Sequence, residues 1–197
     1  MKTFISIVVP VLLMSPAFLH AIPGDEHWDA QFGEPGLAGT SGYVYAITTH
    51  NGQTYAGGLF TGSITNTPIE VWNGAQWTTV GRAEGYPQAI VYDMAFVGNY
   101  LYIAGKFTNV NGVAANGLAR WDGANWSSVG FAGTGYALAV SGNNLYVAGG
   151  FTNAASDGSV ATNIACWDGA AWHELGDGLG LPGSLTVSDF GRFAEMI

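Results

Sequence analysis

Short apolar runs separated by turn residues recur along most of this chain. In its later part, positions 137–140, 145–148 and 163–167 are rich in apolar residues, as strands of a packed sheet would be. The Ser-Gly-Asn-Asn segment at 141–144 separates the first two runs, and such residues tolerate the positive φ of a turn. Asp168-Gly169 follows the third run as a two-residue hairpin signal, so positions 170–175 return as a fourth strand. This pattern predicts four antiparallel strands in sequential order.

The same order of runs and turns occurs three times, and each copy ends in a pair of tryptophans. The first Trp of each pair is residue 72, 121 or 167, so the period is 49 and then 46 residues. A unit of this length cannot bury both faces of its sheet alone, and such periods are typical of propeller blades. We therefore predict an all-β fold, a β-propeller-like array of about three four-stranded antiparallel blades at 43–81, 89–130 and 136–176. The ring would be incomplete, because closed propellers have about four to eight blades.

Tryptophans, glycines and Asp-Gly turns carry most of the repeated pattern. With Asp122-Gly123 as a two-residue turn, Trp121 lies opposite Ala124 and Trp126 lies diagonally on the same face. We expect the Trp pairs to pack against the next blade, with stacking on a sugar as the alternative. The residues expected to have structural roles in the repeat are Trp72, Trp77, Trp121, Trp126, Trp167, Trp172, Gly57, Gly58, Gly105, Gly149, Gly150, Asp122, Gly123, Asp168 and Gly169.

The other face of the outer hairpins carries more varied residues. We expect Glu70, Arg120 and Cys166 at equivalent positions there, where Glu70 and Arg120 could form an ion pair between blades. His173 is expected diagonally across from Cys166. The pair is interpreted as a buried thiol beside a polar residue, with a Cys–His nucleophile as the alternative. Cys166 is the single cysteine, so the chain forms no intramolecular disulfide.

The two ends of the chain depart from the repeat. Residues 1–21 contain one charge, Lys2, followed by an apolar stretch at 4–14, which is typical of a secretory signal peptide. An uncleaved N-terminal anchor is the alternative. The segment at 22–42 contains an isolated outer strand at 27–33, and 177–197 begins a fourth repeat whose pattern is then lost. We interpret the chain as a fragment of a longer protein, or as half of a homodimer that closes a six-bladed ring.

Charge narrows the range of partners. The chain has 30 glycines, only 10% charged residues and a net charge of −9. Loss of Lys2 with the signal peptide would leave four basic residues against fourteen acidic ones, near −10. A surface this acidic repels nucleic-acid phosphates and anionic lipid headgroups. We therefore expect a secreted, extracellular, periplasmic or cell-surface protein that neither binds nucleic acid nor inserts into the membrane after signal cleavage.

Two short motifs resemble a known family. Leu145-Tyr146-Val147-x-Gly149-Gly150, followed by Asn163-Ile164-Ala165-x-Trp167-Asp168 and Trp172, resembles the kelch-type repeat of galactose-oxidase-like β-propellers. It is also similar to the Asn-Ile-Ala-x-Trp-Asp-Gly-x-x-Trp repeats of uncharacterised secreted proteins and of fungal cortical cell-polarity marker propellers. In the second repeat Lys106 replaces the second Gly, and in the first Asn73-Gly74 replaces Asp-Gly. The resemblance covers about residues 43–176 and implies the fold, whereas such propellers have many unrelated activities.

These observations favour a secreted binding or scaffold module for a protein or glycan ligand. The loops between second and third strands differ in length, which places a variable rim on one side of the array. The candidate ligand residues on that rim are Asn109, Asn111, Asn153, Ser156 and Asp157. They are rich in oxygen but do not form a calcium-loop motif, so we expect no metal, no cofactor and no catalytic residue. The alternative is part of a secreted carbohydrate-active or galactose-oxidase-like enzyme, although His27, His50 and His173 show no paired metal-ligand spacing.

Overall fold

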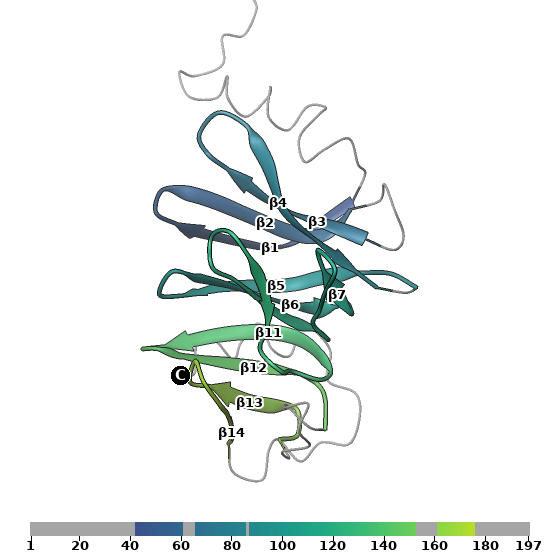
Figure 1. Ribbon diagram of the computed structural model, residues 1–197, viewed down its shortest axis with the longest axis vertical. Helices are drawn as coiled ribbons and strands as arrows, with labels where there is room; N and C mark the ends of the chain where they lie inside the picture. The colour runs from purple at the N-terminus through teal and green to yellow at the C-terminus, as the bar shows by residue number, and fades with distance from the viewer. Residues whose placement is uncertain (1–41, 61–65, 86, 153–160, 176–197) are drawn as a thin grey trace, which may run out of the picture. The chain divides into compact units, whose positions relative to one another are not determined.

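The computed structural model describes residues 42–60, 66–85, 87–152 and 161–175, which form strands and turns and contain no helix (Figure 1). All of them belong to one compact unit, 37–197. The predicted signal peptide at 1–21, all but the last residue of the segment at 22–42, and the predicted fourth repeat at 177–197 lie outside the described residues. No described segment is a helix long and apolar enough to cross a membrane. The prediction of an all-β fold is confirmed for the described part of the chain.

The strands form three antiparallel sheets. The first has six strands in the order β1-β2-β3-β4-β7-β8, and the other two have the orders β10-β9-β6-β5 and β11-β12-β13-β14. The first sheet consists of β1 (Gly42–His50), β2 (Gln53–Phe60), β3 (Asn66–Trp72), β4 (Trp77–Glu84), β7 (Asn109–Val110) and β8 (Val113–Ala114). The second consists of β5 (Ile90–Val97), β6 (Tyr100–Lys106), β9 (Leu118–Trp121) and β10 (Trp126–Ser128). The third consists of β11 (Thr134–Ser141), β12 (Asn144–Gly150), β13 (Ile164–Trp167) and β14 (Trp172–Glu174).

The turn between the first two strands of the third sheet forms where the sequence predicts it. Ser141 pairs with Asn144 across β11 and β12, which leaves a two-residue loop. Gly142 in that loop has a φ of 60°, a value that glycine adopts without strain. In the first sheet, Asn51 and Gly52 form the equivalent loop with φ values of 49° and 75°. Positive φ at both positions matches the twist of a tight hairpin, so these residues determine the strand register.

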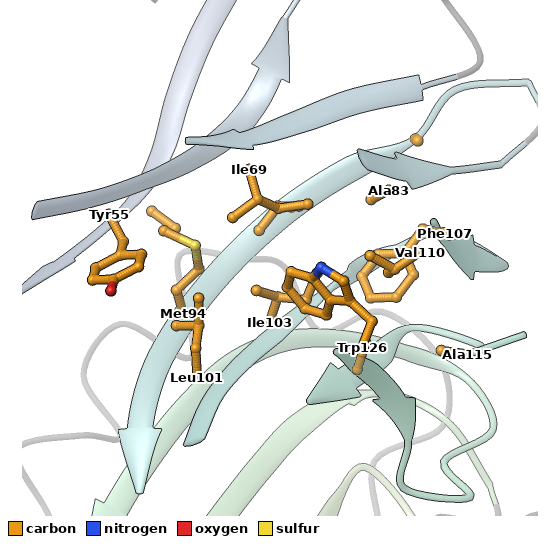
Figure 2. Packing of buried hydrophobic residues seen from close by; sticks show 14 of the residues in the cluster. Tyr55, Ile69, Ala83, Met94, Leu101, Ile103, Phe107, Val110, Ala115 and Trp126 are labelled. Atoms are coloured by element: carbon orange, nitrogen blue, oxygen red, sulfur yellow. The ribbon is translucent and has the colours of Figure 1, made fainter. Parts of the chain in front are cut away.

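Two apolar layers hold the three sheets together. Strand β6 contributes to both, because successive side chains of a strand point to opposite faces. Leu101 and Ile103 lie in the core between the first and second sheets, whereas Tyr102 and Ala104 lie in the core between the second and third. Figure 2 shows the first of these cores, where Ile69 of the first sheet faces Ile103 and Trp126 of the second. The described strands form three sheets that do not close into a ring.

Candidate functional site

The tryptophans of each outer hairpin face each other directly. Trp72 pairs with Trp77, Trp121 with Trp126 and Trp167 with Trp172, with ring centroids 5.7, 6.2 and 5.2 Å apart. The predicted shared face is therefore confirmed, whereas the predicted two-residue turn and diagonal placement are wrong. The loop has four residues, and the Asp-Gly or Asn-Gly pair fills its first two positions instead of spanning the whole turn.

A carboxylate or amide oxygen at the first loop position explains this longer turn. Oδ1 of Asp122 accepts hydrogen bonds from the backbone N–H groups of Ala124 (2.8 Å) and Asn125 (2.7 Å). The backbone N–H of Asp122 donates to the carbonyl of Asn125 across the loop at 3.1 Å. Gly123 supports the arrangement with a φ of 100°. Asn73 and Asp168 make the same contacts in the other two sheets, so the predicted turn residues keep a structural role with a different turn length.

The second Trp of a pair joins its sheet to the preceding one. Nε1 of Trp126 donates to the backbone carbonyl of Val80 in β4 at 2.9 Å, and Nε1 of Trp172 donates to the carbonyl of Val129 at 2.8 Å. Val80 and Val129 occupy the same position after the second Trp of their own hairpins. The rings therefore pack against the preceding sheet, not the next one as the sequence analysis expected. The contacts of Trp126 and Trp172 are those of packing between sheets, so sugar stacking has no support for these two rings.

Gly81 allows the indole of Trp126 to approach β4. A Cβ atom on Gly81 would lie 2.5 Å from Nε1 and 2.7 Å from Cε2 of Trp126. These distances are too short for a side chain, so the indole can lie against this strand only where the residue is glycine. As a result, Trp126 is buried, with only 8% of its surface exposed to solvent.

On the other face of the outer hairpins, two predictions are wrong: the equivalence of Glu70 with Arg120 and Cys166, and the ion pair between Glu70 and Arg120. Arg120 pairs with Ser127 and Cys166 with His173, and the equivalent pair in the first sheet is Val71 with Thr78. Glu70 lies two residues before Trp72, so strand alternation places it on the face of that tryptophan and not opposite it. Glu70 is buried and accepts a hydrogen bond from Thr79 Oγ1 at 2.7 Å. Cζ of Arg120 lies 4.6 Å from the ring centroid of Tyr100. Within the described residues the one ion pair joins His173 to Asp168, so the expected Glu70–Arg120 pair does not form there.

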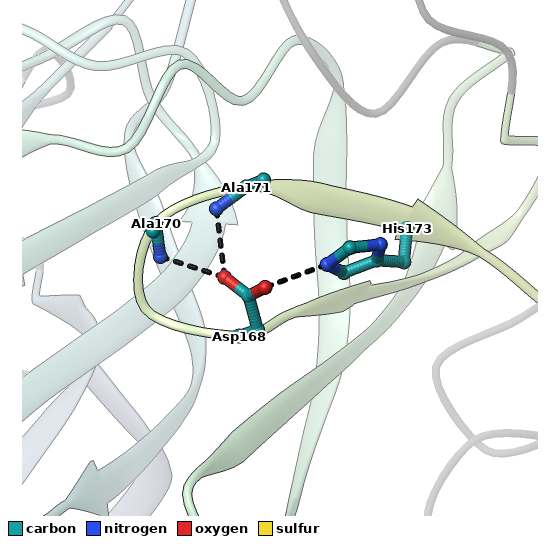
Figure 3. Close-up of polar contacts among 4 residues, drawn as sticks. All are labelled: Asp168, Ala170, Ala171 and His173. Carbon is teal, nitrogen blue, oxygen red and sulfur yellow. Dashed lines mark hydrogen bonds and ion pairs between the residues drawn. The ribbon is translucent and has the colours of Figure 1, made fainter.

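His173 is paired with a carboxylate and not with the cysteine. Its Nε2 lies 2.7 Å from Oδ2 of Asp168. Figure 3 draws this contact beside the hydrogen bonds that Ala170 and Ala171 donate to Asp168. The His173 contact, followed by the N–H groups of Ala171 and Ala170, lowers the pKa of Asp168 to about 2. Cys166 lies directly opposite His173, not diagonal to it. Burial is the main cause that raises the pKa of the Cys166 thiol, which favours an inert thiol over a nucleophile.

Two of the predicted rim residues connect sheets instead of forming an open rim. Asn109 pairs with Glu84 where β7 joins the edge of β4. Asn111 has a φ of 50°, its Oδ1 accepts from the N–H of Arg82 at 2.8 Å, and its own N–H donates to the carbonyl of Arg82 at 3.0 Å. These contacts attach a loop of the second sheet to the first sheet. The other candidate rim residues, Asn153, Ser156 and Asp157, lie outside the described residues.

Three glycines mark a repeated irregularity in the inner strands. A Cβ atom on Gly58, Gly105 or Gly149 would overlap the carbonyl oxygen of Tyr43, Ile90 or Thr134, respectively. In each sheet the strand register then shifts by one residue, between Val44 and Ala46, Val91 and Asp93, and Gly135 and Ala137. Gly58, and not Gly57, is therefore the residue of the first sheet that is equivalent to Gly105 and Gly149. The close approach of the two backbones coincides with a β-bulge in β1, β5 and β11.

The residue at each bulge is a tyrosine. Tyr45, Tyr92 and Tyr136 come from three different sheets, and their ring centroids are 6.1 Å (Tyr45–Tyr92) and 5.3 Å (Tyr92–Tyr136) apart. Tyr43 extends this row, with its ring nearly parallel to that of Tyr45 at 6.0 Å. We call these four residues the tyrosine row. Figure 1 shows their strands β1, β5 and β11 one after another in the stack of sheets.

One end of the tyrosine row is open to solvent. Tyr43 is 64% exposed and Tyr45 is 48% exposed, whereas Tyr92 is half-buried. Burial is the main cause that raises the pKa of Tyr92, with smaller contributions from Tyr136 and Tyr45, so its phenol stays neutral at ordinary pH. This row was not among the residues predicted from the sequence. Its signal is present, because a tyrosine recurs at 45, 92 and 136 with nearly the same period as the Trp pairs.

A carboxylate beside the row ties two sheets together. Oδ2 of Asp93 accepts from the N–H of Leu138 in β11 at 2.7 Å, while Oδ1 accepts from the N–H of Met94 at 2.7 Å. Burial raises the pKa of Asp93, and the two N–H donors oppose that shift. Asp93 therefore fixes the relative position of the strands that carry Tyr92 and Tyr136.

No protein-family model matches this chain, and no curated protein matches it either. The kelch-like resemblance therefore stays a prediction from sequence.

Proposed function

We propose that this chain is a secreted binding or scaffold module whose sheets are kelch-like β-propeller blades. The architecture is supported by relationships that recur from sheet to sheet. The indoles of Trp126 and Trp172 reach back to equivalent carbonyls, and Gly58, Gly105 and Gly149 approach equivalent carbonyls in the inner strands. The indole bonds join neighbouring sheets, as expected of a repeat array in which each unit contacts only its neighbours, whereas the glycine contacts lie within each sheet and recur from one sheet to the next. Secretion rests on the signal-like composition of residues 1–21.

The tyrosine row is the observation that favours binding. Tyrosine combines a large apolar ring with a polar hydroxyl, and it loses little side-chain entropy when a ligand covers it. Tyr43 and Tyr45 offer such rings to solvent, and both lie on strand β1, Tyr45 at its bulge, instead of on a loop. Rigid strands position a binding surface more accurately than loops do.

A screen of the purified secreted chain on glycan and peptide arrays tests this function. We expect wild-type protein to retain at least one class of ligand and the Tyr45→Ala variant to lose it. Tyr100→Ala is the matched control, because Tyr100 is 42% exposed but lies outside the row, where Arg120 covers its ring. Equal array signals from wild type and Tyr45→Ala would contradict a binding role for the row.

We also propose that a second copy of the chain completes the ring. Support comes from Trp77, which is equivalent to Trp126 and Trp172 but whose Nε1 has no acceptor among the described residues. A preceding sheet would supply that acceptor. Light scattering of the secreted protein on a sizing column tests this proposal. A discrete dimer is expected, whereas a stable monomer at high concentration would contradict closure by a second copy.

A further inference from the structure

The tyrosine row is continuous across three sheets. Its neighbouring ring centroids lie 6.0, 6.1 and 5.3 Å apart, which are contact distances for aromatic rings. A ligand laid along the row would therefore pass from one ring to the next without a gap. Such an arrangement suits an extended ligand with repeating units better than a single small molecule.

The surroundings of the row are unsuited to a charged ligand. Within the described residues, the one cation–ring contact places Arg120 over Tyr100, which lies outside the row. The carboxylate of Asp93 is engaged within the protein by two backbone N–H groups, and burial raises its pKa, which disfavours its charged form. The chain as a whole has a net charge of −9, which repels anionic polymers. An uncharged ligand is therefore favoured.

Ring contact also argues against a proline-rich peptide. Extended proline-rich segments bind in grooves between aromatic side chains. Here the rings touch one another, so the row has no slot of this kind between Tyr45 and Tyr92. It presents ring surfaces and phenolic hydroxyls instead. A pyranose offers the complement, because its C–H groups contact an aromatic face while its hydroxyls bond to phenol oxygens.

We propose that the tyrosine row binds a neutral, extended glycan along β1, β5 and β11. This inference rests on the proposed binding function and specifies its ligand class. Tyr43 and Tyr45 form the entry end of the site, since their rings are the most exposed. Tyr92 continues the surface toward the third sheet.

Calorimetric titration of the secreted chain tests the inference. The probes are three neutral oligosaccharides (cellohexaose, laminarihexaose and chitohexaose), an anionic oligogalacturonate, and a decaproline peptide. We expect saturable binding of at least one neutral hexaose, weakened about tenfold by Tyr45→Ala, because removal of a stacking ring costs about that much affinity. Tyr45→Phe keeps the ring and should stay within about threefold of wild type, while Tyr100→Ala should have no effect. Thermal unfolding of each variant verifies that it is folded.

Failure of the ligand class and failure of the binding function give different results. Binding of decaproline or oligogalacturonate in a Tyr45-dependent way, without any neutral hexaose, would overturn the glycan and leave the binding function intact. Hexaose binding that is unchanged in both folded variants, Tyr45→Ala and Tyr45→Phe, would overturn the row as its site. The absence of Tyr45-dependent binding for every probe and on the arrays would overturn both proposals.

Discussion

Trp126 and Val80 lie in different sheets, and the indole N–H of Trp126 donates to the backbone carbonyl of Val80 at 2.9 Å. The same relationship joins Trp172 to Val129 at 2.8 Å. Since these bonds are made by the side chain of one sheet and the main chain of another, they couple the sheets without continuing any strand ladder. Trp126 and Trp172 thus belong to the packing between sheets. The aromatic side chains that are open to a ligand are those at the exposed end of the tyrosine row.

Replacement of Trp126 by Phe removes the bond to Val80 and keeps an aromatic ring in the core. We expect the free energy of unfolding to fall by about 1 kcal/mol beyond the effect of the smaller ring, because the partly buried carbonyl of Val80 loses its donor. Trp77→Phe is the control, since Nε1 of Trp77 has no acceptor among the described residues. Urea unfolding measures both variants, and equal losses of stability would show that the hydrogen bond contributes nothing.

Replacement of Gly81 by Ala places a Cβ atom 2.5 Å from Nε1 of Trp126. We expect a loss of about 1–3 kcal/mol from overpacking. Gly150→Ala is the matched control, because its nearest neighbour, Cε2 of Tyr136, lies at an ordinary 3.6 Å. In a Trp126→Ala background the added methyl has room, so the cost of Gly81→Ala should nearly vanish in a double-mutant cycle. A cost that is the same in both backgrounds would place the strain elsewhere.

The Asp168–His173 contact should be visible in a titration of the carboxyl groups. The pKa of Asp168 is lowered to about 2, first by His173 and then by the N–H groups of Ala171 and Ala170. His173→Ala should therefore raise the pKa of Asp168 toward its ordinary value of 3.8. Carboxyl-carbon NMR measures this shift.

Asp122 is the internal control for that experiment. Its pKa is also lowered, mainly by the N–H groups of Asn125 and Ala124, and it has no histidine partner. It should not move in His173→Ala. Because the folded pKa of Asp168 lies below 3.8, its stabilising effect is present above pH 3.8 and is lost as the pH falls through about 2. An unchanged Asp168 titration in the variant would contradict the role given to His173.

Asp93 should act on stability in the opposite direction. Burial raises its folded pKa above 3.8, so the folded state binds a proton more tightly than the unfolded state. The stabilisation of the fold by protonated Asp93 is fully present below pH 3.8, and it is lost as the pH rises through the raised folded pKa. Asp93→Asn should remove this slope from the stability curve, which chemical denaturation at a series of pH values measures. It should also lower stability near neutral pH, since one amide oxygen replaces the two that serve Met94 and Leu138.

The order of the four main strands in each repeat and the two-residue turns follow from local sequence. The two short strands β7 and β8 that extend the first sheet to six strands, the four-residue loops and the tyrosine row do not. The loop at 141–144 was predictable, because Gly and Asn adopt positive φ without help from the rest of the chain. The four-residue loop at Asp122 was not, since a side-chain oxygen that accepts two N–H groups competes with the usual two-residue turn. The bulges depend on the close approach of Gly58, Gly105 and Gly149 to another strand. That contact is tertiary, so the alternation along β1 or β5 alone could not place Tyr45 beside Tyr92.

The direction of the indole bonds makes the array unequal at its two ends. Each described donor belongs to a later part of the chain than its acceptor, so during synthesis the carbonyls of Val80 and Val129 are made before the indoles that reach them. Removal of the third sheet would leave the carbonyl of Val129 to be hydrated. Removal of the first sheet would uncover the large indole ring of Trp126, which is only 8% exposed while that sheet is present, and so would expose apolar surface to water as well as the N–H group. Shortened versions of this protein should therefore begin at the natural start of the first sheet and lose sheets from the other end.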